Sequence, residues 1–234
     1  MNLITDIKPA LKSENRVNIF VDGKFDFSLD VAQVVDLHIK VGKHLTPSEL
    51  SDCRHASEFG KLYTNTLEYV LSRPHSIKEV RDHLILKRTR RELMNRQAIN
   101  NRKKPKDERI KFKLRTKEIP LYTDQDIDNV ISRLTEKGYL DDAKFTTFYI
   151  ENRFYKKGIS KKRLVQELHQ KGISSDIIET VMADTGRSDA DEIKKIIEKK
   201  KNKYTEDKLI AYLVRQGFDY QQSKDAVREM DLQN

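Results

Sequence analysis

Two adjacent carboxylates, Asp141 and Asp142, are the side chains of this sequence that most resemble catalytic groups. Paired carboxylates can act as general acid and general base when their surroundings hold their pKa values apart. Such chemistry needs partner side chains and a pocket, and the flanking residues 134–145 indicate neither. The same residues are typical of a helix boundary, because Gly138 suits the left-handed position that ends a helix and either aspartate can cap the next helix. We therefore interpret the pair as structural.

The remaining reactive side chains form no pattern that supports catalysis or metal binding. Cys53 and His55 are close in the sequence but lack further ligands at metal-site spacing. The sequence contains no phosphate-binding P-loop, no HExxH and no paired CxxC. We therefore predict a protein that is not an enzyme and that has no catalytic residue, no cofactor and no metal. The other histidines are scattered without an evident partner: His38, His44, His75, His83 and His169.

The composition predicts a helical protein of the cytoplasm. The chain of 234 residues has only 8 Gly and 5 Pro, and few breakers among many Lys, Glu, Leu and Ile favour long helices. Its one cysteine excludes an intrachain disulfide and fits a reducing compartment. The N-terminus lacks the apolar core of a signal peptide, and no run reaches the roughly 18 apolar residues of a membrane span. We expect no membrane partner.

The first residues are predicted to form a small sheet followed by helices. Apolar residues alternate in 17–21 and again in 25–29, and Asp22-Gly23 lies between these runs. Asp-Gly in this position is a strong signal for a β-hairpin with a type I′ turn. The stretch NLITDIK adds a candidate third strand, and a short helix then begins after Asp30 and ends near Gly42. Thr46-Pro47 is typical of the N-cap and first residue of a helix and predicts a longer helix from this point.

Three later segments share one spacing, which indicates a repeat. Each of the segments 76–84, 160–168 and 205–213 begins with a hydroxyl residue, has an aliphatic residue four positions on, and has Leu four beyond that. The hydroxyls of Ser76, Ser160 and Thr205 can cap helices. Gly172 and Gly217 follow the last two leucines by four residues and can end them. The repeating element is predicted to be three helices.

These signals define a fold class and four segments. We predict a mainly α protein of tandem three-helix repeats, with a small N-terminal segment that contains a β-hairpin. The N-terminal hairpin and helix segment covers residues 1–57. Repeat 1 covers 58–140 with a basic insertion at about 87–121, repeat 2 covers 141–186, and repeat 3 covers 187–234.

The insertion concentrates the positive charge of the chain. Residues 87–117 hold 14 Lys and Arg against three acids, whereas the rest of the chain holds 32 basic and 34 acidic residues. Its first half can prolong the preceding helix, and the alternation in 110–115 predicts a strand. The segment is a candidate contact for polyphosphate, and the alternative is a solvated charge run. The basic candidates are Lys87, Arg88, Arg90, Arg91, Arg96, Arg102, Lys103, Lys104, Lys106, Arg109, Lys111, Lys113, Arg115 and Lys117.

The middle of the sequence resembles the RecX family of bacterial recombination regulators. The resemblance rests on LEYVLSRPHSIKEVRDHL, on the turn GYLDDAKF, on Arg153, Gly158 and Arg163, and on the L-x-x-KGI ending after Leu168. It covers roughly residues 59–230 and implies a curved, all-helical array that is not an enzyme. Two features depart from the family: the insertion replaces the Gly-aromatic turn of repeat 1, and the N-terminal segment is matched only weakly.

The resemblance also implies a function. A protein of this family is expected to bind the RecA recombinase filament on DNA, to lie along its groove, and to restrain its ATP hydrolysis and strand exchange. The expected partners are therefore the RecA filament and its single-stranded DNA, with the chain acting as a monomer. Arg153 and Arg163 join the basic insertion as candidate contacts. The alternative is a general nucleic-acid-binding protein that acts through the insertion alone.

Overall fold

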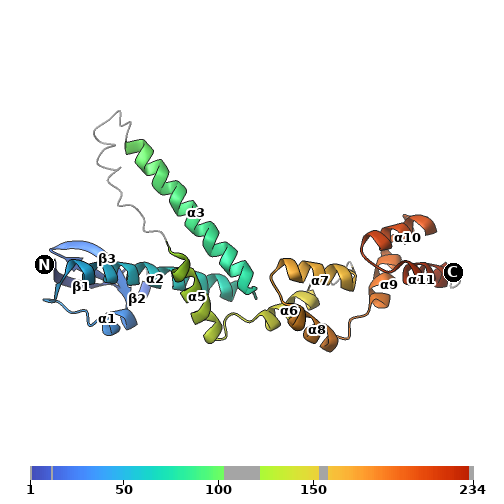
Figure 1. Cartoon of the computed structure of the whole chain (residues 1–234), viewed down its shortest axis with the longest axis horizontal. Coiled ribbons are helices and arrows are strands. Elements are labelled where there is room, and N and C mark those ends of the chain that lie inside the picture. The colour runs from blue at the N-terminus through green and yellow to red at the C-terminus, as the bar shows by residue number, and fades with distance from the viewer. Residues whose placement is uncertain (1, 12, 103–121, 153–157, 232–234) are drawn as a thin grey trace. The chain divides into compact units, whose positions relative to one another are not determined.

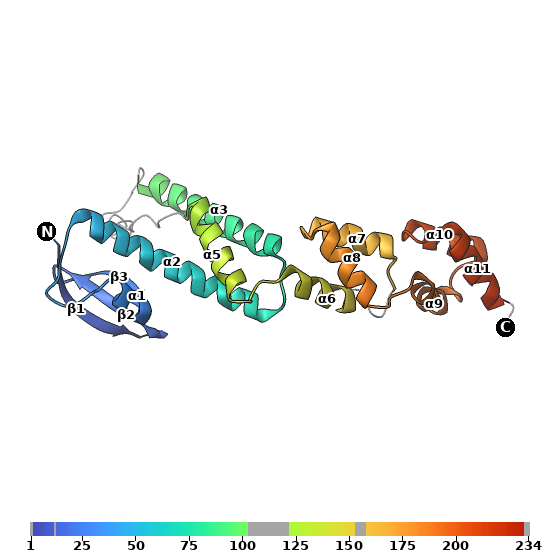
Figure 2. The ribbon, with the colours of Figure 1, turned by 60° about the horizontal axis from the view of Figure 1, so that its bottom comes forward.

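The computed structural model describes residues 2–11, 13–102, 122–152 and 158–231. Within these ranges the chain is mainly helical with one small antiparallel sheet at its N-terminus, which confirms the predicted fold class (Figures 1 and 2). The chain divides into two compact units. The N-terminal unit contains Met1–Leu71 and His83–Leu134, and the C-terminal unit contains Ser72–Asp82 and Thr135–Asn234. The curvature of the array and the four segment boundaries stay predictions.

The sheet of the N-terminal unit has four strands in the order β3-β2-β1-β4. The strands are β1 (Asn2–Ala10), β2 (Ser13–Val21), β3 (Lys24–Asp30) and β4 (His44–Leu45), and neighbouring strands are antiparallel. Asp22 and Gly23 have φ values of 49° and 77°, as a type I′ turn requires. The hairpin and the third strand are therefore confirmed. The two-residue β4 is too short for its sequence to have predicted it.

The first helix ends earlier than the sequence suggested. Helix α1 (Val31–Asp36) begins at a capping box between Asp30 and Gln33. It does not extend to Gly42, because His38 adopts a left-handed conformation with φ 50°. The His38 and Ile39 amides donate to the Val35 and Val34 carbonyls, and this pair of bonds ends a helix in the Schellman pattern. The prediction that this helix ends near Gly42 was therefore wrong, because it ends at Asp36.

Helix α2 (Pro47–Ser72) covers one face of the sheet. It begins as predicted, with the Thr46 hydroxyl accepting a hydrogen bond from the Glu49 amide and the Glu49 carboxylate accepting one from the Thr46 amide. Cys53 belongs to the core between the sheet and α2 and is buried. The buried residues of this core come from every strand named above, from α2 and from the segment between α1 and β4: Ile4, Ile19, Val21, Phe27, Leu29, Ile39, Leu45, Leu50 and Cys53.

The part of α3 (Ile77–Arg102) from His83 onward and the part of α5 (Asp124–Glu136) up to Leu134 complete the N-terminal unit. His83 of α3 stacks on Tyr69 of α2, with ring centroids 4.0 Å apart. The Arg133 guanidinium of α5 lies over the ring of Tyr63 of α2 at 4.9 Å from its centroid. The later residues of α3 and the helix α5 therefore both belong to one packed body with α2.

The C-terminal unit contains two sets of three helices, each with its own core. The first set is α6 (Asp142–Asn152), α7 (Lys161–Gln170) and α8 (Ser175–Asp184). The second set is α9 (Asp189–Lys200), α10 (Glu206–Arg215) and α11 (Tyr220–Asp231). Phe145, Leu164 and Ile178 lie in the first core, and Ile193, Leu213 and Val227 lie in the second. These sets are the predicted three-helix repeats.

The repeats are joined by hydrogen bonds between helix ends. The Ser76 hydroxyl donates to the Lys171 carbonyl at 2.8 Å, and the Ser160 hydroxyl donates to the Gln216 carbonyl at 2.7 Å. Both carbonyls belong to the C-cap residues of the helix that follows in the next repeat. Two side chains of the same repeats accept in return. Asp142 Oδ1 accepts from the Ile77 amide at 2.9 Å, and Asp189 Oδ1 accepts from the Lys161 amide at 2.7 Å.

Glycine is required at these junctions for two separate reasons. Gly172 and Gly217 end α7 and α10 with φ values of 83° and 92°, which side chains disfavour. A Cβ atom added at Gly172 would also lie 2.7 Å from the Lys78 Cβ, and one added at Gly217 would lie 2.7 Å from the Ser160 Oγ. Gly138 has a similar φ of 73° but has nothing within 4 Å of the added Cβ. Gly138 is therefore a matched reference for the first effect alone.

We predict that Gly172→Ala lowers the free energy of unfolding more than Gly138→Ala does. The positive φ alone should cost about 1 kcal/mol at either site. The collision with Lys78 should add about 1–3 kcal/mol at Gly172, because the stem of that side chain must move. Chemical denaturation of both variants measures the difference. Equal losses would mean that the α7 end does not approach α3 as described.

Candidate interaction surface

The candidate surface lies on the second half of α3, which is the described part of the basic insertion. Arg88 stands four residues after Leu84, where the later repeats have glycine, and no Gly or Pro occurs before Pro105. The helix therefore continues to Arg102. Arg102 is described only as the last residue of this helix. Nine candidates and the predicted strand at 110–115 lie outside the described residues: Lys103, Lys104, Lys106, Arg109, Lys111, Lys113, Arg115, Lys117 and Arg153.

The basic residues of α3 divide between two faces, and one face packs on the N-terminal unit. Arg88 Nη1 lies 2.7 Å from the Asp124 Oδ1 of α5. Arg91 Nη1 lies 3.2 Å from the Glu58 Oε2 of α2, and its guanidinium lies 4.2 Å from the centroid of the Tyr122 ring. Arg88 and Arg91 therefore hold α3 against α2 and α5, and their charges are balanced within the unit.

Electrostatics on this inner face keep Glu58 ionised. Burial alone would raise the pKa of Glu58, but the hydrogen bond and charge of Lys61 and the neighbouring Arg91 outweigh it and lower that pKa below its ordinary value of 4.5. Burial lowers the pKa of Lys87, and the charge of Arg91 adds to this effect. Burial also raises the pKa of Tyr122, so its phenol stays neutral beside Arg91. The inner face is a neutralised packing surface.

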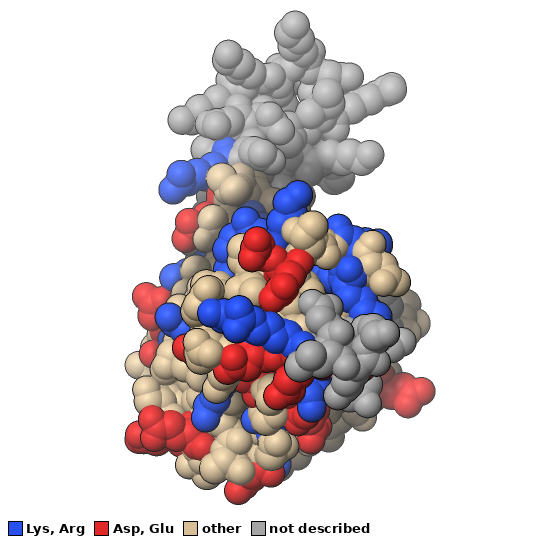
Figure 3. Space-filling model, turned by 90° about the vertical axis from the view of Figure 1, so that its right-hand side faces the viewer, with Lys and Arg blue, Asp and Glu red and all other residues tan. Residues whose placement is uncertain are grey.

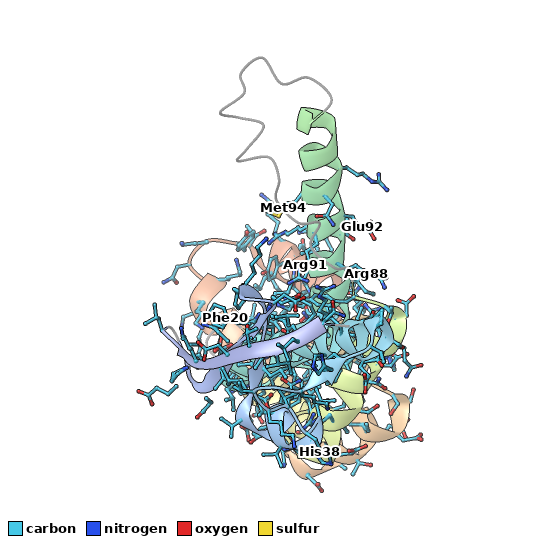
Figure 4. The ribbon with its side chains drawn as sticks, turned by 90° about the vertical axis from the view of Figure 1, so that its left-hand side faces the viewer. Phe20, His38, Arg88, Arg91, Glu92 and Met94 are labelled. Carbon is cyan, nitrogen blue, oxygen red and sulfur yellow. The ribbon has the colours of Figure 1, made fainter. Side chains whose placement is uncertain are left out.

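The outer face of α3 is different, because it combines exposed cations with exposed aliphatic side chains. We define it by six exposed residues, Ile85, Leu86, Arg90, Leu93, Met94 and Arg96. Helical periodicity places Leu86 and Leu93 at its centre, and Ile85 and Met94 at its opposite edges. Within the described part of the chain, neither Arg90 nor Arg96 pairs with a carboxylate. Figure 4 shows Met94 and Glu92 on opposite sides of the helix, so Glu92 lies away from the Met94 edge. Glu92 stands four residues before Arg96 and therefore lies near the Arg96 edge of the outer face.

On the face that Figure 3 shows, the C-terminal unit has no concentration of basic side chains like that on α3. The C-terminal repeats that face the viewer in Figure 3 carry interspersed basic and acidic side chains. The candidate Arg163 is engaged at the repeat junction, where its Nη1 donates to the Gln216 Oε1 at 2.6 Å. Its Nε lies 3.5 Å from Glu167. Arg163 is therefore occupied in joining α7 to α10.

The aspartate pair lies at a helix boundary. Asp141 accepts hydrogen bonds from the Ala143 and Lys144 amides and so caps α6. Asp142 reaches the first amide of α3 instead. The hydroxyls of Ser160 and Ser76 accept from amides in the first turns of α7 and α3, whereas the Thr205 side chain makes no capping bond. Among the residues that the structure describes, no cluster of His, Cys, Asp and Glu could hold a metal ion.

Sequence reasoning missed two features of this region. The first is a capping box at the start of α5, where Thr123 and Asp126 exchange hydrogen bonds and Asp126 lies 3.0 Å from His55 Nε2. The Thr-x-x-Asp spacing could have indicated the box. The second is the exposed aliphatic row of the outer face, which the seven-residue spacing of Leu86 and Leu93 could have indicated. Nothing in the local sequence indicates which arginines face inward.

Two family models match separate parts of the chain. Residues 2–46, which contain the sheet and α1, match the regulatory protein RecX N-terminal domain. Residues 141–182, which contain α6, α7 and most of α8, match the second three-helix domain of RecX. Both matches are to domains of the RecX family, so the chain is similar to that family over these two ranges. The N-terminal segment that the sequence analysis matched only weakly is thus itself similar to a RecX domain.

Relatives of full length agree with this similarity. The regulatory protein RecX of Bacillus licheniformis is 27% identical over 242 residues, covering 100% of this chain and 80% of the relative. The regulatory protein RecX of Caldanaerobacter subterraneus is 27% identical over 228 residues, covering 96% of this chain and 98% of the relative. A crystal structure of regulatory protein RecX has a TM-score of 0.65 at 19% identity and covers 96% of this chain and 100% of its own; it supports the fold. No helix among the described residues is long and apolar enough to cross a membrane.

We predict that Arg91→Gln destabilises the chain and that Arg90→Gln does not. Removing Arg91 takes away one of the two cationic partners of Glu58, leaving Lys61, and the contact with Tyr122, which together should cost about 1–2 kcal/mol at neutral pH. Arg90 is exposed on the outer face and has no such contacts, so its removal should cost less than about 0.5 kcal/mol. Urea unfolding of both variants measures the difference.

The pH dependence of the Arg91→Gln loss is a further check. A lowered carboxyl pKa stabilises the fold above the ordinary pKa of 4.5, and that stabilisation is lost as the pH falls through the folded-state value. The gap between Arg91→Gln and the parent should therefore narrow below pH 4.5. A gap that stays constant with pH would contradict the Glu58 contact.

Proposed function

We propose that this chain binds RecA recombinase filaments on DNA and restrains their ATP hydrolysis and strand exchange. In this role it regulates recombination and DNA repair through binding and without catalysis, as a cytoplasmic monomer. The observation that carries the proposal is the outer face of α3, where Arg90 and Arg96 have no ion-pair partner among the described residues, on a chain whose residues outside 87–117 are nearly neutral in sum. Similarity to a family of regulatory proteins supports the same role.

The physical basis of the contact is the difference between the two faces of α3. Arg88 and Arg91 already have carboxylate partners, so they gain little from a new anion. Arg90 and Arg96 are exposed to solvent, and they gain when they meet phosphate groups or acidic side chains on a filament. The proposed contact therefore involves Arg90 and Arg96, together with the basic residues of the insertion that lie outside the described ranges.

The alternative of a general nucleic-acid-binding protein finds less support. Proteins that hold single strands without other partners use aromatic side chains on which bases stack. The outer face of α3 carries aliphatic side chains instead, and Phe112 is the one aromatic residue of the insertion 87–117. Phosphate contacts alone would also leave the aliphatic row without a role.

We predict that replacing Arg90 and Arg96 with Gln weakens inhibition of RecA ATPase on single-stranded DNA. Gln keeps the helix propensity of α3 while removing two charges. The concentration needed for half-inhibition should rise about tenfold, which corresponds to the loss of two solvent-accessible ionic contacts. The salt dependence of binding should also become shallower, because fewer counterions are released.

A matched control removes two exposed cations from the C-terminal unit. Lys194→Gln with Lys208→Gln changes the net charge by the same amount and should leave inhibition unchanged within about twofold. Equal effects of the two double variants would show that only the net charge matters. A parent chain that leaves the ATPase rate unaltered, yet binds bare DNA tightly at physiological salt, would favour the general nucleic-acid binder.

A further inference from the structure

We propose that the outer face of α3 docks on protein, and that the complementary surface is an apolar groove with carboxylates at its rim. This inference rests on the proposed function, because it takes the recombinase protomers of the filament as the source of that groove. It goes beyond the proposed function because it assigns the outer face of α3 to a contact with protein and not with DNA. Arg90 and Arg96 would then pair with acidic side chains, and the aliphatic row would enter the groove.

The first argument is the amount of aliphatic surface on one side of a helix. Leu86 and Leu93 are each 51% exposed, Met94 is 60% exposed and Ile85 is 38% exposed. Single exposed apolar residues are common on soluble proteins. Leu86 and Leu93 share one face with Ile85 and Met94 at its two edges, and their i, i+7 spacing matches that with which helices anchor in protein grooves.

The second argument is the placement of the charges around that row. Leu86 and Leu93 are seven residues apart and form the middle of the outer face. Arg90 and Arg96 fall on opposite sides of this pair by helical periodicity. An apolar ridge with a cation on each flank is complementary to an apolar groove with an acid on each rim. Phosphates could pair with the arginines but would offer the two leucines no apolar partner.

The third argument concerns what else could cover the face. Residues 103–121 follow α3 directly and hold eight Lys and Arg against three acids, so their charge opposes docking beside Arg90 and Arg96. A second copy of this chain would bring the same two arginines against the first pair. Both candidates within the protein are thus disfavoured by like charge, whereas an acidic partner is favoured.

The test uses the full chain with Leu86→Gln and Leu93→Gln together, and Leu71→Gln as the matched control. Leu71 is a leucine of α2 that is 65% exposed and lies outside the outer face. Affinity is measured for RecA filaments assembled on single-stranded DNA and, separately, for the same DNA without recombinase. We expect the double variant to lose at least about tenfold in filament affinity, with DNA binding unchanged, and Leu71→Gln to match the parent.

A second variant protects the test against loss of folding. Met94→Gln changes a single, more exposed side chain and should reduce filament affinity about threefold while circular dichroism and the unfolding curve stay those of the parent. Filament affinity that is unchanged in both variants, or DNA affinity that falls in parallel with it, would overturn the inference while leaving the proposed function standing. The inference would also be overturned if the parent chain sediments as a dimer and the variant with Leu86→Gln and Leu93→Gln sediments as a monomer. A parent chain that fails to bind the filament would contradict both the proposed function and this inference.

Discussion

The polar groups at helix ends are the constraint on which the C-terminal unit depends. The first amides and last carbonyls of a helix lack partners within it, and leaving them buried without hydrogen bonds is costly. Here the neighbouring repeat supplies those partners. Ser76 and Ser160 donate to C-cap carbonyls of the repeat that follows, and Asp142 and Asp189 accept from first amides of the repeat that precedes. Each helix end thus becomes a specific attachment point.

This arrangement explains why small and short side chains recur at the junctions. Gly172 and Gly217 allow the helix ends to approach the preceding repeat, and any Cβ there would meet Lys78 or Ser160. The close approach of the repeats also partly buries a charged group, the Asp142 carboxylate. Burial raises the pKa of Asp142, the bond from Ile77 opposes this, and the charge of Asp141 adds to it. Its carboxylate is thus kept at the junction because it satisfies an amide that would otherwise be buried alone.

Local signals in the sequence were sufficient for much of the fold. The Asp22-Gly23 turn, the Thr46-Pro47 helix start and the repeat spacing each depend on residues within a few positions of one another, so they could be recognised directly. The α1 end was missed because His38 takes a conformation that glycine usually occupies. The partner of Asp142 and the inward direction of Arg91 depend on residues tens of positions away. No local pattern carries such information.

The candidate surface shows why that distant information matters for function. Lys87 and Arg91 are four residues apart on α3, and like charges at this spacing repel within a helix. Glu58 from α2 lies beside Arg91, and Asp124 from α5 offsets Arg88 one turn away. The inner face can therefore pack despite its basic composition. Because those carboxylates are on the inner side, Arg90 and Arg96 have no ion-pair partner among the described residues. A helix that looks uniformly basic in the sequence thus has one face for folding and another that is free to bind.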